Sequence, residues 1–315
     1  MRYDPTKLRE QIFKALPSGF VVSEHTEREH FYRVMDPNVG NPKYPSVTAQ
    51  LQVLKDEGLA NFKMNRVVDY TFAHFKEFND ANVLDHLDQA MKEPTRIFED
   101  AGDVGTQIHD YREVIFSQWI STGVKPTNFP SFVPSDREDI RAISALAALE
   151  KFVDDYNYIP VVTEIKVFDH KLGIAGTLDD LGLMRSIIRP PVKDCTHEYI
   201  ADPNKNIDRC VKCDAKWKWE FVLMDLKSSN RFKDHYFFQV AMYFYMLRKL
   251  TGIKLDRCFI LKVSKEDRTY KLEDLKRPAK LAQYAKHIIE TNNGIEFIKT
   301  LRKDNLKKVA DPIIL

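Results

Sequence analysis

The sequence predicts an α/β protein, in which a mixed sheet flanked by helices follows a helical N-terminal region. Two observations lead to this prediction. Turn residues followed by apolar residues at helical spacing dominate residues 1–100. Between residues 160 and 265, stretches rich in β-branched residues and broken by Gly and Asp alternate with one strongly apolar helix. This order of elements suits an α/β core.

The expected helices begin at recognisable capping residues. Ser46 is expected to cap the first, because a serine side chain satisfies a free N–H at a helix start. Ser135 and Glu138 form a capping box for a later helix. The expected helices lie within residues 42–78, 96–123, 135–156 and 235–252, and the expected strands lie at residues 160–169, 172–184, 220–229 and 256–265.

We divide the chain into three parts. Residues 1–100 form the helical N-terminal region, residues 101–270 form the core, and residues 271–315 form a charged helical tail. The core is interrupted by residues 186–220, which carry most of the cysteines. A structureless loop of that length inside a compact domain is unusual, so this segment needs its own source of order.

Composition excludes several classes of protein. No apolar run approaches the roughly 18–20 residues of a membrane span, so no membrane partner is expected. The N-terminal residues lack the apolar stretch of a secretory signal, and we therefore expect an intracellular, cytoplasmic protein. In a reducing compartment the four cysteines do not predict a disulfide framework.

Charge is unevenly distributed along the chain. Residues 1–100 hold 13 Lys+Arg and 16 Asp+Glu, whereas residues 216–262 hold 10 Lys+Arg and 4 Asp+Glu. A local basic surplus beside a candidate site favours a polyanionic partner. An ordinary solvated face explains the same charges equally well, and charge alone leaves both interpretations open.

The stretch FVLMDLKSS, residues 221–229, ends an apolar strand with two charged residues. Residues two apart on a strand point to the same face, so Asp225 and Lys227 are expected side by side. Asp179 lies in GTLDD on the preceding expected strand, and His109 lies in the helical stretch GTQIHDYRE. These residues are candidates for one site at the strand ends.

The chemistry of phosphodiester hydrolysis explains such a set. Two carboxylates close together repel each other unless a divalent cation lies between them. Mg²⁺ accepts oxygen ligands, and it makes a bound water nucleophilic while polarising the phosphoryl oxygen. Lys227 would offset charge that builds on the phosphate. The addition of His109 makes the site more suitable for Mn²⁺.

Each motif alone is weak. An Asp-x-Lys is common on surfaces, GTLDD is compatible with a simple turn, and His109 by itself is more often structural. Gln239 and Tyr243, four apart on the apolar helix, share one face and are most often ordinary helix surface. The prediction rests on the order and spacing of the motifs and on their position at apolar strand ends.

In that order the motifs resemble the PD-(D/E)xK nuclease superfamily, in its RecB-like exonuclease branch. That branch includes mitochondrial genome maintenance exonucleases, CRISPR adaptation nucleases and phage-type members. The resemblance covers roughly residues 44–262 and depends on His109, GIAGTLDD, FVLMDLKSS and QVAMY. It implies a restriction-endonuclease-like core, with a mixed sheet flanked by helices.

The resemblance also implies roles for individual residues. His109, Asp179, Asp225 and the Leu226 carbonyl would hold Mg²⁺ or Mn²⁺, and Lys227 would be the catalytic lysine. Glu164 would contribute either to the metal shell or to the fold. Asp180 is the adjacent alternative to Asp179, and the family register favours Asp179.

Residues expected to contact DNA flank this site. Gln239 and Tyr243 offer hydrogen bonds and a ring to a nucleic acid strand. Basic residues and an aromatic residue near the same strand extend the set. These further residues are Arg231, Lys233, Lys216 and Trp217. The tryptophans of this segment are equally well explained by packing of the insertion onto the core.

The insertion departs from the family pattern and predicts a second metal. It holds Cys195-x-His197 and Cys210-x-x-Cys213, two close pairs of ligands that match a closed structural zinc site. Asp214 follows the second pair where a zinc-knuckle turn more often has Gly. A flexible loop with unpaired thiols is the alternative, and the insertion is otherwise expected to be a zinc-binding, finger-like arm.

The expected activity is that of a Mg²⁺- or Mn²⁺-dependent deoxyribonuclease, an exonuclease acting on free or single-stranded DNA ends. Its expected context is replication, recombination or repair, in a phage or a cellular genome, with replication or recombination proteins as partners. Two alternatives stay open: a non-catalytic DNA-binding module on a nuclease fold, and a structure-specific endonuclease. No Gly-x-x-x-x-Gly-Lys-[Ser/Thr] motif occurs, so no motor is expected in this chain.

Overall fold

The structure of the chain is a computed structural model. It describes residues 3–16, 20–25, 30–36, 39–54, 58–79, 81–135, 139–192, 195–196, 198–202 and 207–310. Its helices are α1 (Pro5–Ala15), α2 (Val47–Gln50), α3 (Gly58–His74), α4 (Val83–Thr122), α5 (Ile140–Tyr156), α6 (Asp234–Thr251) and α7 (Pro278–Ala310). Short 3-10 helices lie at Leu51–Leu54, Phe75–Glu77 and Phe129–Phe132.

The strands form two sheets. They are β1 (Phe20–His25), β2 (His30–Met35), β3 (Lys43–Pro45), β4 (Ile159–Asp169), β5 (Ile174–Arg189), β6 (Tyr199–Asp202), β7 (Ile207–Cys210), β8 (Lys216–Lys227), β9 (Arg257–Val263) and β10 (Tyr270–Asp274). The main sheet has the order β10-β9-β8-β5-β4, and β1-β2-β3 form a small sheet. Strands β8 and β9 are parallel, while β5 is antiparallel to both β4 and β8. The fold is therefore mixed α/β, with a curled and largely antiparallel main sheet.

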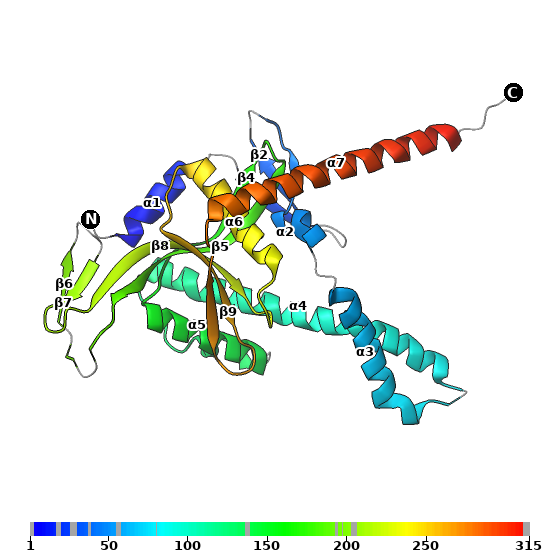
Figure 1. The fold of residues 1–315 in the computed structure, drawn as a ribbon, viewed down its shortest axis with the longest axis horizontal. Helices are drawn as coiled ribbons and strands as arrows, with labels where there is room; N and C mark the ends of the chain where they lie inside the picture. Colours follow the sequence, from blue (N-terminus) through cyan, green and yellow to red (C-terminus); the bar gives the residue numbers. More distant parts are fainter. Residues whose placement is uncertain are drawn as a thin grey trace.

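Helices cover both faces of the main sheet, as Figure 1 shows. On one face α1, α6 and α7 pack through residues such as Ile12, Val240 and Ala282 onto the sheet. On the other face α4 and α5 pack through residues such as Ile108 and Leu146. Burial of apolar side chains on both faces fits the near-continuous apolar strands in the centre of the sheet.

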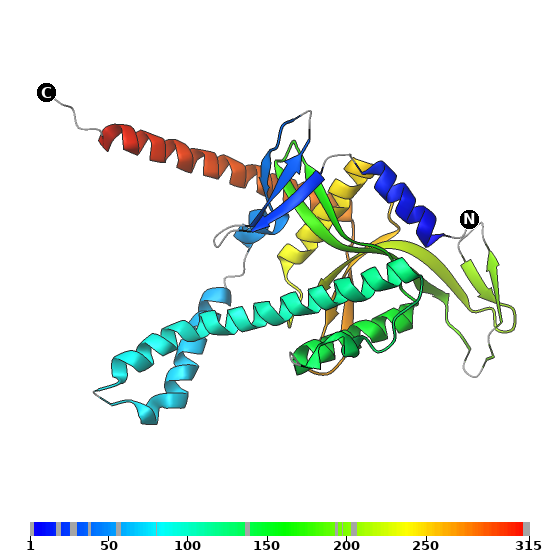
Figure 2. The ribbon, with the colours of Figure 1, turned by 180° about the vertical axis from the view of Figure 1, so that it is seen from behind.

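Helix α4 serves two parts of the molecule. Its second half packs on the sheet, and its first half pairs with α3 in a hairpin that projects from the body (Figures 1 and 2). Within the hairpin the rings of Phe62 and Phe98 have centroids 5.1 Å apart. The hairpin exposes large apolar side chains, among them Phe72 and Leu84. Gly123, with φ at 72°, ends α4 in the left-handed conformation that glycine tolerates.

The helix starts confirm one sequence expectation and correct another. Ser46 caps α2, where its Oγ accepts a hydrogen bond from the Ala49 N–H at 3.0 Å. Helix α5 begins at Ile140 and is capped by Asp139 instead of Ser135, since the Asp139 carboxylate accepts from the Arg141 N–H at 2.8 Å. Glu138, the other half of the expected capping box, lies outside the described residues.

Strands appear in two places where helix or irregular structure was expected. Residues within 1–100 form β1, β2 and β3, whose sequences FVVSEH, HFYRVM and KYP are rich in β-branched and aromatic residues. Strand β10 takes the first residues of what was expected to be a wholly helical tail. Both depend on pairing with a neighbouring strand, which a local pattern signals weakly.

The insertion at residues 186–220 is built as a continuation of the sheet. Strand β5 extends to Arg189 and β8 begins at Lys216, so the two strands stay paired well into the insertion. The short strands β6 and β7 pair with each other, and β7 also pairs with β8. We call residues 186–220 the arm. None of the described helices is long and apolar enough to cross a membrane.

Two glycines give a matched test of packing in this fold. A Cβ at Gly182, in β5, would lie 2.3 Å from the ring of buried Tyr158, so Gly182→Ala should lower the free energy of unfolding by about 1–3 kcal/mol. At Gly102, inside α4, a Cβ would meet no described atom within 4 Å, so Gly102→Ala should raise it by about 0.5–1 kcal/mol. Denaturant unfolding of the two variants measures both changes in the free energy of unfolding. An equal decrease in both variants would contradict the packing described for β5.

Candidate functional site

Asp225 and Lys227 lie at the end of β8, between β5 and β9. The Lys227 ammonium lies 2.8 Å from Asp225 Oδ2, and the two side chains are 16% and 1% exposed. The pair is therefore almost removed from water. Its placement follows from the period of two along a strand, which brings residues i and i+2 to one face.

Asp179 lies on the neighbouring strand β5 and reaches the same strand end. Its Oδ2 accepts a hydrogen bond from the Leu226 backbone N–H at 2.7 Å. The same oxygen lies 3.7 Å from Nδ1 of His109, which α4 presents to the sheet. The structure thus brings together His109, Asp179 and Leu226, three of the residues singled out from the sequence.

The two carboxylates have opposite electrostatic environments. Burial raises the pKa of Asp225 to about 7, with Lys227 opposing the rise and Asp179 adding to it. Burial also acts to raise the pKa of Asp179, but His109, Arg112 and Lys227 together hold it below its usual value. Neighbouring acids that differ in this way are common at functional sites.

The basic partners respond to the same charges. Burial acts to lower the pKa of Lys227, but Asp225 and then Asp179 raise it above the ordinary value, so the ammonium stays charged. The pKa of His109 is lowered, chiefly by desolvation of the ring against the sheet, although 31% of the side chain remains exposed. A neutral imidazole is the form that can bind a metal.

Arg112, which sequence reasoning missed, lies fully buried beneath this site. Its Nη1 donates to Asp180 Oδ2 at 2.6 Å, and its Nη2 donates to Glu164. The geometry therefore separates the adjacent acids: Asp180 pairs with Arg112, while Asp179 contacts His109 and Leu226. Arg112 follows His109 by three residues and so shares its helix face, which is the signal that could have found it.

Glu164 has an unusual backbone conformation inside β4. Its φ is 54°, in the left-handed region that a non-glycine residue in a strand rarely adopts. Burial raises its pKa to about 7, with Arg112 acting to lower it. Of the two roles expected for Glu164, the contact with Arg112 fits support of the fold, and strain of this kind gathers at functional sites.

The position of Tyr243 corrects one expectation. The ring is 4% exposed and accepts a hydrogen bond on its hydroxyl from Gln239 Nε2 at 3.0 Å. A Cβ at Gly176 would lie 2.6 Å from Tyr243 Cε1, so the ring fills the space that this glycine leaves. Tyr243 is therefore a packing residue beside the site, and its ring is not exposed for a base to stack on.

The remaining residues expected to contact DNA fall into two separate places. Arg231 and Lys233 lie in the connection from β8 to α6, next to Lys227. Lys216 and Trp217 lie at the other end of β8, where about 3.3 Å per residue places Lys216 roughly 36 Å from Lys227. Lys216 and Trp217 are therefore distant from the acid site and lie apart from Arg231 and Lys233.

Trp217 belongs to an aromatic cluster at the base of the arm. Its ring meets that of Tyr199 edge-on with centroids 4.8 Å apart, and the Arg185 guanidinium lies 5.0 Å from the Trp217 centroid. Arg185 also approaches Trp219, whose Nε1 donates to Asp208 at 2.9 Å. Of the two interpretations left open for the tryptophans, these contacts favour packing of the arm.

The arm carries a compact cysteine cluster. The sulfur atoms of Cys195, Cys210 and Cys213 all lie within 4.8 Å of one another, so this group could hold a metal ion. Burial, and then hydrogen bonds with Cys213 and Cys210, raise the pKa of the Cys195 thiol to about 11. Without a cation the Cys195 thiol therefore resists ionisation beside the other two sulfurs. His197, the fourth ligand expected from the sequence, lies outside the described residues.

The turn after the second cysteine pair has the conformation expected of a knuckle. The Asp214 N–H donates to the Cys210 carbonyl at 2.9 Å, and the Cys210 N–H donates to the Ala215 carbonyl at 2.8 Å. Asp214 has φ at 58°, the left-handed conformation in which glycine is more usual. Its carboxylate is held by Arg189 and Arg209, which explains how an aspartate occupies this position.

The acid site is less compact than the cysteine cluster. Among the residues that the structure describes, the cysteine trio is the group of three or more ligand atoms within 4.8 Å of one another. The Asp225 carboxylate contacts Lys227, whereas the Asp179 carboxylate lies near His109. The structure brings these side chains to one strand end without gathering all their ligand atoms around one point.

Comparison with known proteins adds little to this geometry. No family model matches the chain, and no curated protein matches it. Among solved structures, the chain is similar to the crystal structure of SSO0001, at 14% sequence identity and a TM-score of 0.23. That match covers 59% of this chain and 87% of the other. A likeness this weak carries no argument about fold or function.

The buried guanidinium under the site can be tested directly. Arg112→Met leaves Asp180 buried and without its partner, so it should lower the free energy of unfolding by about 3–5 kcal/mol. Adding Asp180→Asn should recover part of this loss, because the orphaned charge is removed. Arg96→Met, at an exposed ion pair on the same helix, should change stability little. Equal losses from Arg112→Met and Arg96→Met in denaturant unfolding would refute the special role of Arg112.

Proposed function

We propose that the chain is a metal-dependent nuclease of the RecB-like branch of the PD-(D/E)xK superfamily, hydrolysing phosphodiester bonds in DNA. One observation carries the proposal. Asp225 is almost fully buried at a strand end, where the Lys227 ammonium lies 2.8 Å from Oδ2 and the other oxygen, Oδ1, has no hydrogen-bond partner among the described residues. A buried carboxylate oxygen without a partner is unfavourable, and a bound cation would supply that partner.

The donor set fits a divalent cation that prefers oxygen. Asp179 and Asp225 supply carboxylates, Leu226 follows Asp225 on β8 and supplies a backbone carbonyl, and His109 supplies a nitrogen. Such a set suits Mg²⁺ and, through the histidine, Mn²⁺. These residues would hold the ion, with the Asp225 carboxylate free to leave its contact with Lys227.

The chain's own residues have separate tasks in this proposal. When bound, the cation supplies a nucleophilic water and neutralises charge on the phosphate. Lys227 presents an ammonium that is kept charged by Asp225 and Asp179, and it stabilises charge developing on the scissile phosphate. Arg112 fixes α4 against β4 and β5, and so positions His109 opposite Asp179.

We further propose that the enzyme degrades DNA from free or single-stranded ends. The proposal of exonuclease action rests on the sequence resemblance, since the same motifs serve endonucleases. DNA is the expected partner, together with proteins of replication or recombination. The intact set of Asp179, Asp225 and Lys227 argues against a DNA-binding module that has lost catalysis.

We propose that the cysteine cluster is a structural zinc site. Three sulfur ligands within 4.8 Å, a knuckle-like turn and short strands that need support all favour a closed site. His197 would complete the set as the fourth ligand. Because the arm is distant from the acid site, zinc would order the arm and take no part in hydrolysis.

Degradation of end-labelled single- and double-stranded DNA tests the nuclease. The wild type should shorten labelled DNA with Mg²⁺ or Mn²⁺ and leave closed circular single-stranded DNA intact. Lys227→Ala should lower the rate by about 10²–10³-fold, because it removes a charge that stabilises the transition state. Lys166→Ala, at an exposed lysine on β4, is the matched control and should retain activity. Wild-type protein that binds DNA but never cuts it, with either metal, would favour the non-catalytic module.

Metal analysis of purified protein tests the zinc site. The wild type should carry about one zinc ion per chain, and Cys213→Ser should lose it and unfold at a lower temperature. Cys258→Ser is the control, because Cys258 is buried by itself in β9, far along the sequence from the cluster. Full zinc occupancy in Cys213→Ser would remove the cysteine cluster as the binding site.

A further inference from the structure

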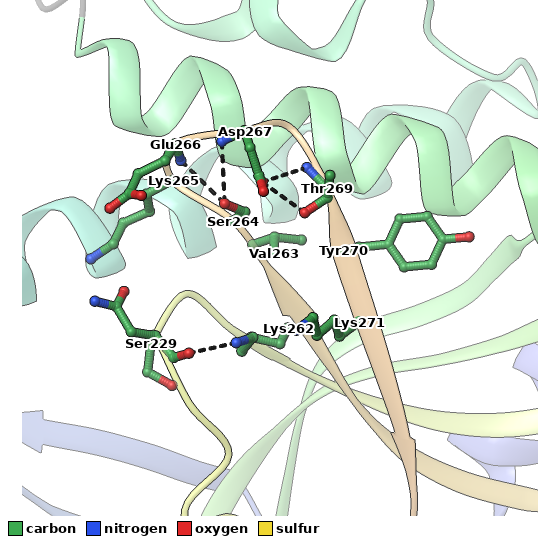
Figure 3. Close-up of a pocket in the computed structure, with 11 residues that line it drawn as sticks. Ser229, Lys262, Val263, Ser264, Lys265, Glu266, Asp267, Thr269, Tyr270 and Lys271 are labelled. Carbon is green, nitrogen blue, oxygen red and sulfur yellow. Dashed lines mark hydrogen bonds between the residues drawn. The ribbon is translucent and has the colours of Figure 1, made fainter.

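A polar pocket of about 300 Å³ lies at the end of β9, formed by the β9–β10 hairpin and the loop that follows β8. Figure 3 shows its lining. Ser229 contributes from the loop after β8, and lysines and hydroxyls contribute from the hairpin. The hairpin residues used below are Lys262, Ser264, Lys265, Thr269 and Lys271.

The pocket adjoins the acid site. Strands β8 and β9 run parallel, and Lys227 lies opposite Lys262 in their register. Neighbouring strands are about 4.8 Å apart, so the backbone of Lys262 lies one strand spacing from that of the proposed catalytic lysine. Ser229 follows Lys227, the last residue of β8, by two residues. The pocket therefore lies beside the strand end at which Lys227 would meet the scissile phosphate.

Three lysines line the pocket and give it positive charge. None of Lys262, Lys265 and Lys271 lies within ion-pair distance of a carboxylate in the part of the chain that the structure describes. Lys262 Nζ donates to the Asn230 carbonyl at 2.6 Å, which holds the ammonium at the pocket wall. Hydroxyl and ammonium groups donate the hydrogen bonds that phosphate oxygens accept in proteins.

Glu266 and Asp267 also line the pocket and offset part of this charge, so three lysines and two acids leave a surplus of one positive charge. The Asp267 carboxylate accepts hydrogen bonds from the Thr269 N–H at 3.1 Å and from its hydroxyl at 2.7 Å, so it is used in the turn. The Lys265 ammonium is partly desolvated, and that burial, followed by the nearby Arg141, lowers its pKa. A bound anion would favour the charged form of Lys265 and so oppose the lowering of its pKa by burial and by Arg141.

We propose that this pocket binds a backbone phosphate of the DNA strand next to the scissile phosphate. The inference rests on the proposed nuclease function and adds to it a subsite that positions the strand. Contacts to phosphate fix register and carry no sequence information, so the subsite would act equally on all sequences. The small volume matches one phosphate with its sugar, at the lower end of ligand pockets.

The salt dependence of binding measures such contacts. With metal chelated to prevent cleavage, a fluorescent single-stranded oligonucleotide is titrated with wild type, with Lys265→Gln, and with the double variant Lys262→Gln, Lys265→Gln. The slope of log affinity against log salt should fall by about 0.7 for each lysine contact removed. The control is Lys166→Gln with Lys276→Gln, two exposed lysines outside the pocket, which should keep the wild-type slope. The single variant Lys265→Gln keeps the hydrogen bond from Lys262 to the Asn230 carbonyl. Its slope therefore reports the loss of one contact without a change in the loop that follows β8.

A second series locates the contact on the DNA. An oligonucleotide with one phosphate replaced by an uncharged methylphosphonate, moved position by position, should bind the wild type less tightly when the replaced phosphate is next to the scissile one. The double variant should be insensitive to replacement at that position, because its contact is already lost. Cleavage with metal is measured on the same preparations.

The outcomes separate the two proposals. A wild type that cleaves DNA, while the double variant keeps both the salt slope and the sensitivity to methylphosphonate, would overturn the subsite and leave the nuclease intact. A wild type that neither binds nor cleaves DNA would overturn the proposed function, and the subsite with it. Reduced slope, together with lost sensitivity at one adjacent phosphate, is the expected result.

Discussion

The buried guanidinium of Arg112 is the interaction on which the acid site depends. It joins α4 to β4 through Glu164 and to β5 through Asp180, and the side chains of Arg112 and Asp180 are both fully buried. Removing such a charge from water is costly, and the cost is offset by close partners on two strands. Because His109 lies one helical turn before Arg112, the same contacts set where the imidazole meets Asp179. A change in this pairing would move a helix as well as a side chain.

The sequence predicted the positions of side chains correctly where these depend on residues close to one another in the chain. Asp225 and Lys227 were expected side by side because a strand has a period of two, and the structure places them 2.8 Å apart. The pattern of Cys210, Cys213 and Asp214 likewise predicted a turn that the backbone adopts. In both cases the residues concerned are close in sequence, so their arrangement needs little information from the rest of the fold.

Features that depend on distant partners were not accessible in this way. Burial of Tyr243 requires the space left by Gly176 on another element, so a ring expected at the surface lies inside. Strands β1 to β3 and β10 exist because a neighbouring strand pairs with them. Arg112 was missed because a charged residue in a helix is ordinarily on its outer face, and its burial requires two acids from distant strands.

The packing of Tyr243 against Gly176 has a consequence for how this protein could change over generations. A side chain at position 176 would require a smaller residue at position 243. A smaller residue at position 243 would in turn leave a cavity next to Gly176. The two positions are separated by an insertion and belong to a strand and a helix, yet they can vary only as a pair. In related sequences we therefore expect the residues at positions 176 and 243 to covary, so a substitution at one position should be accompanied by a matching change at the other.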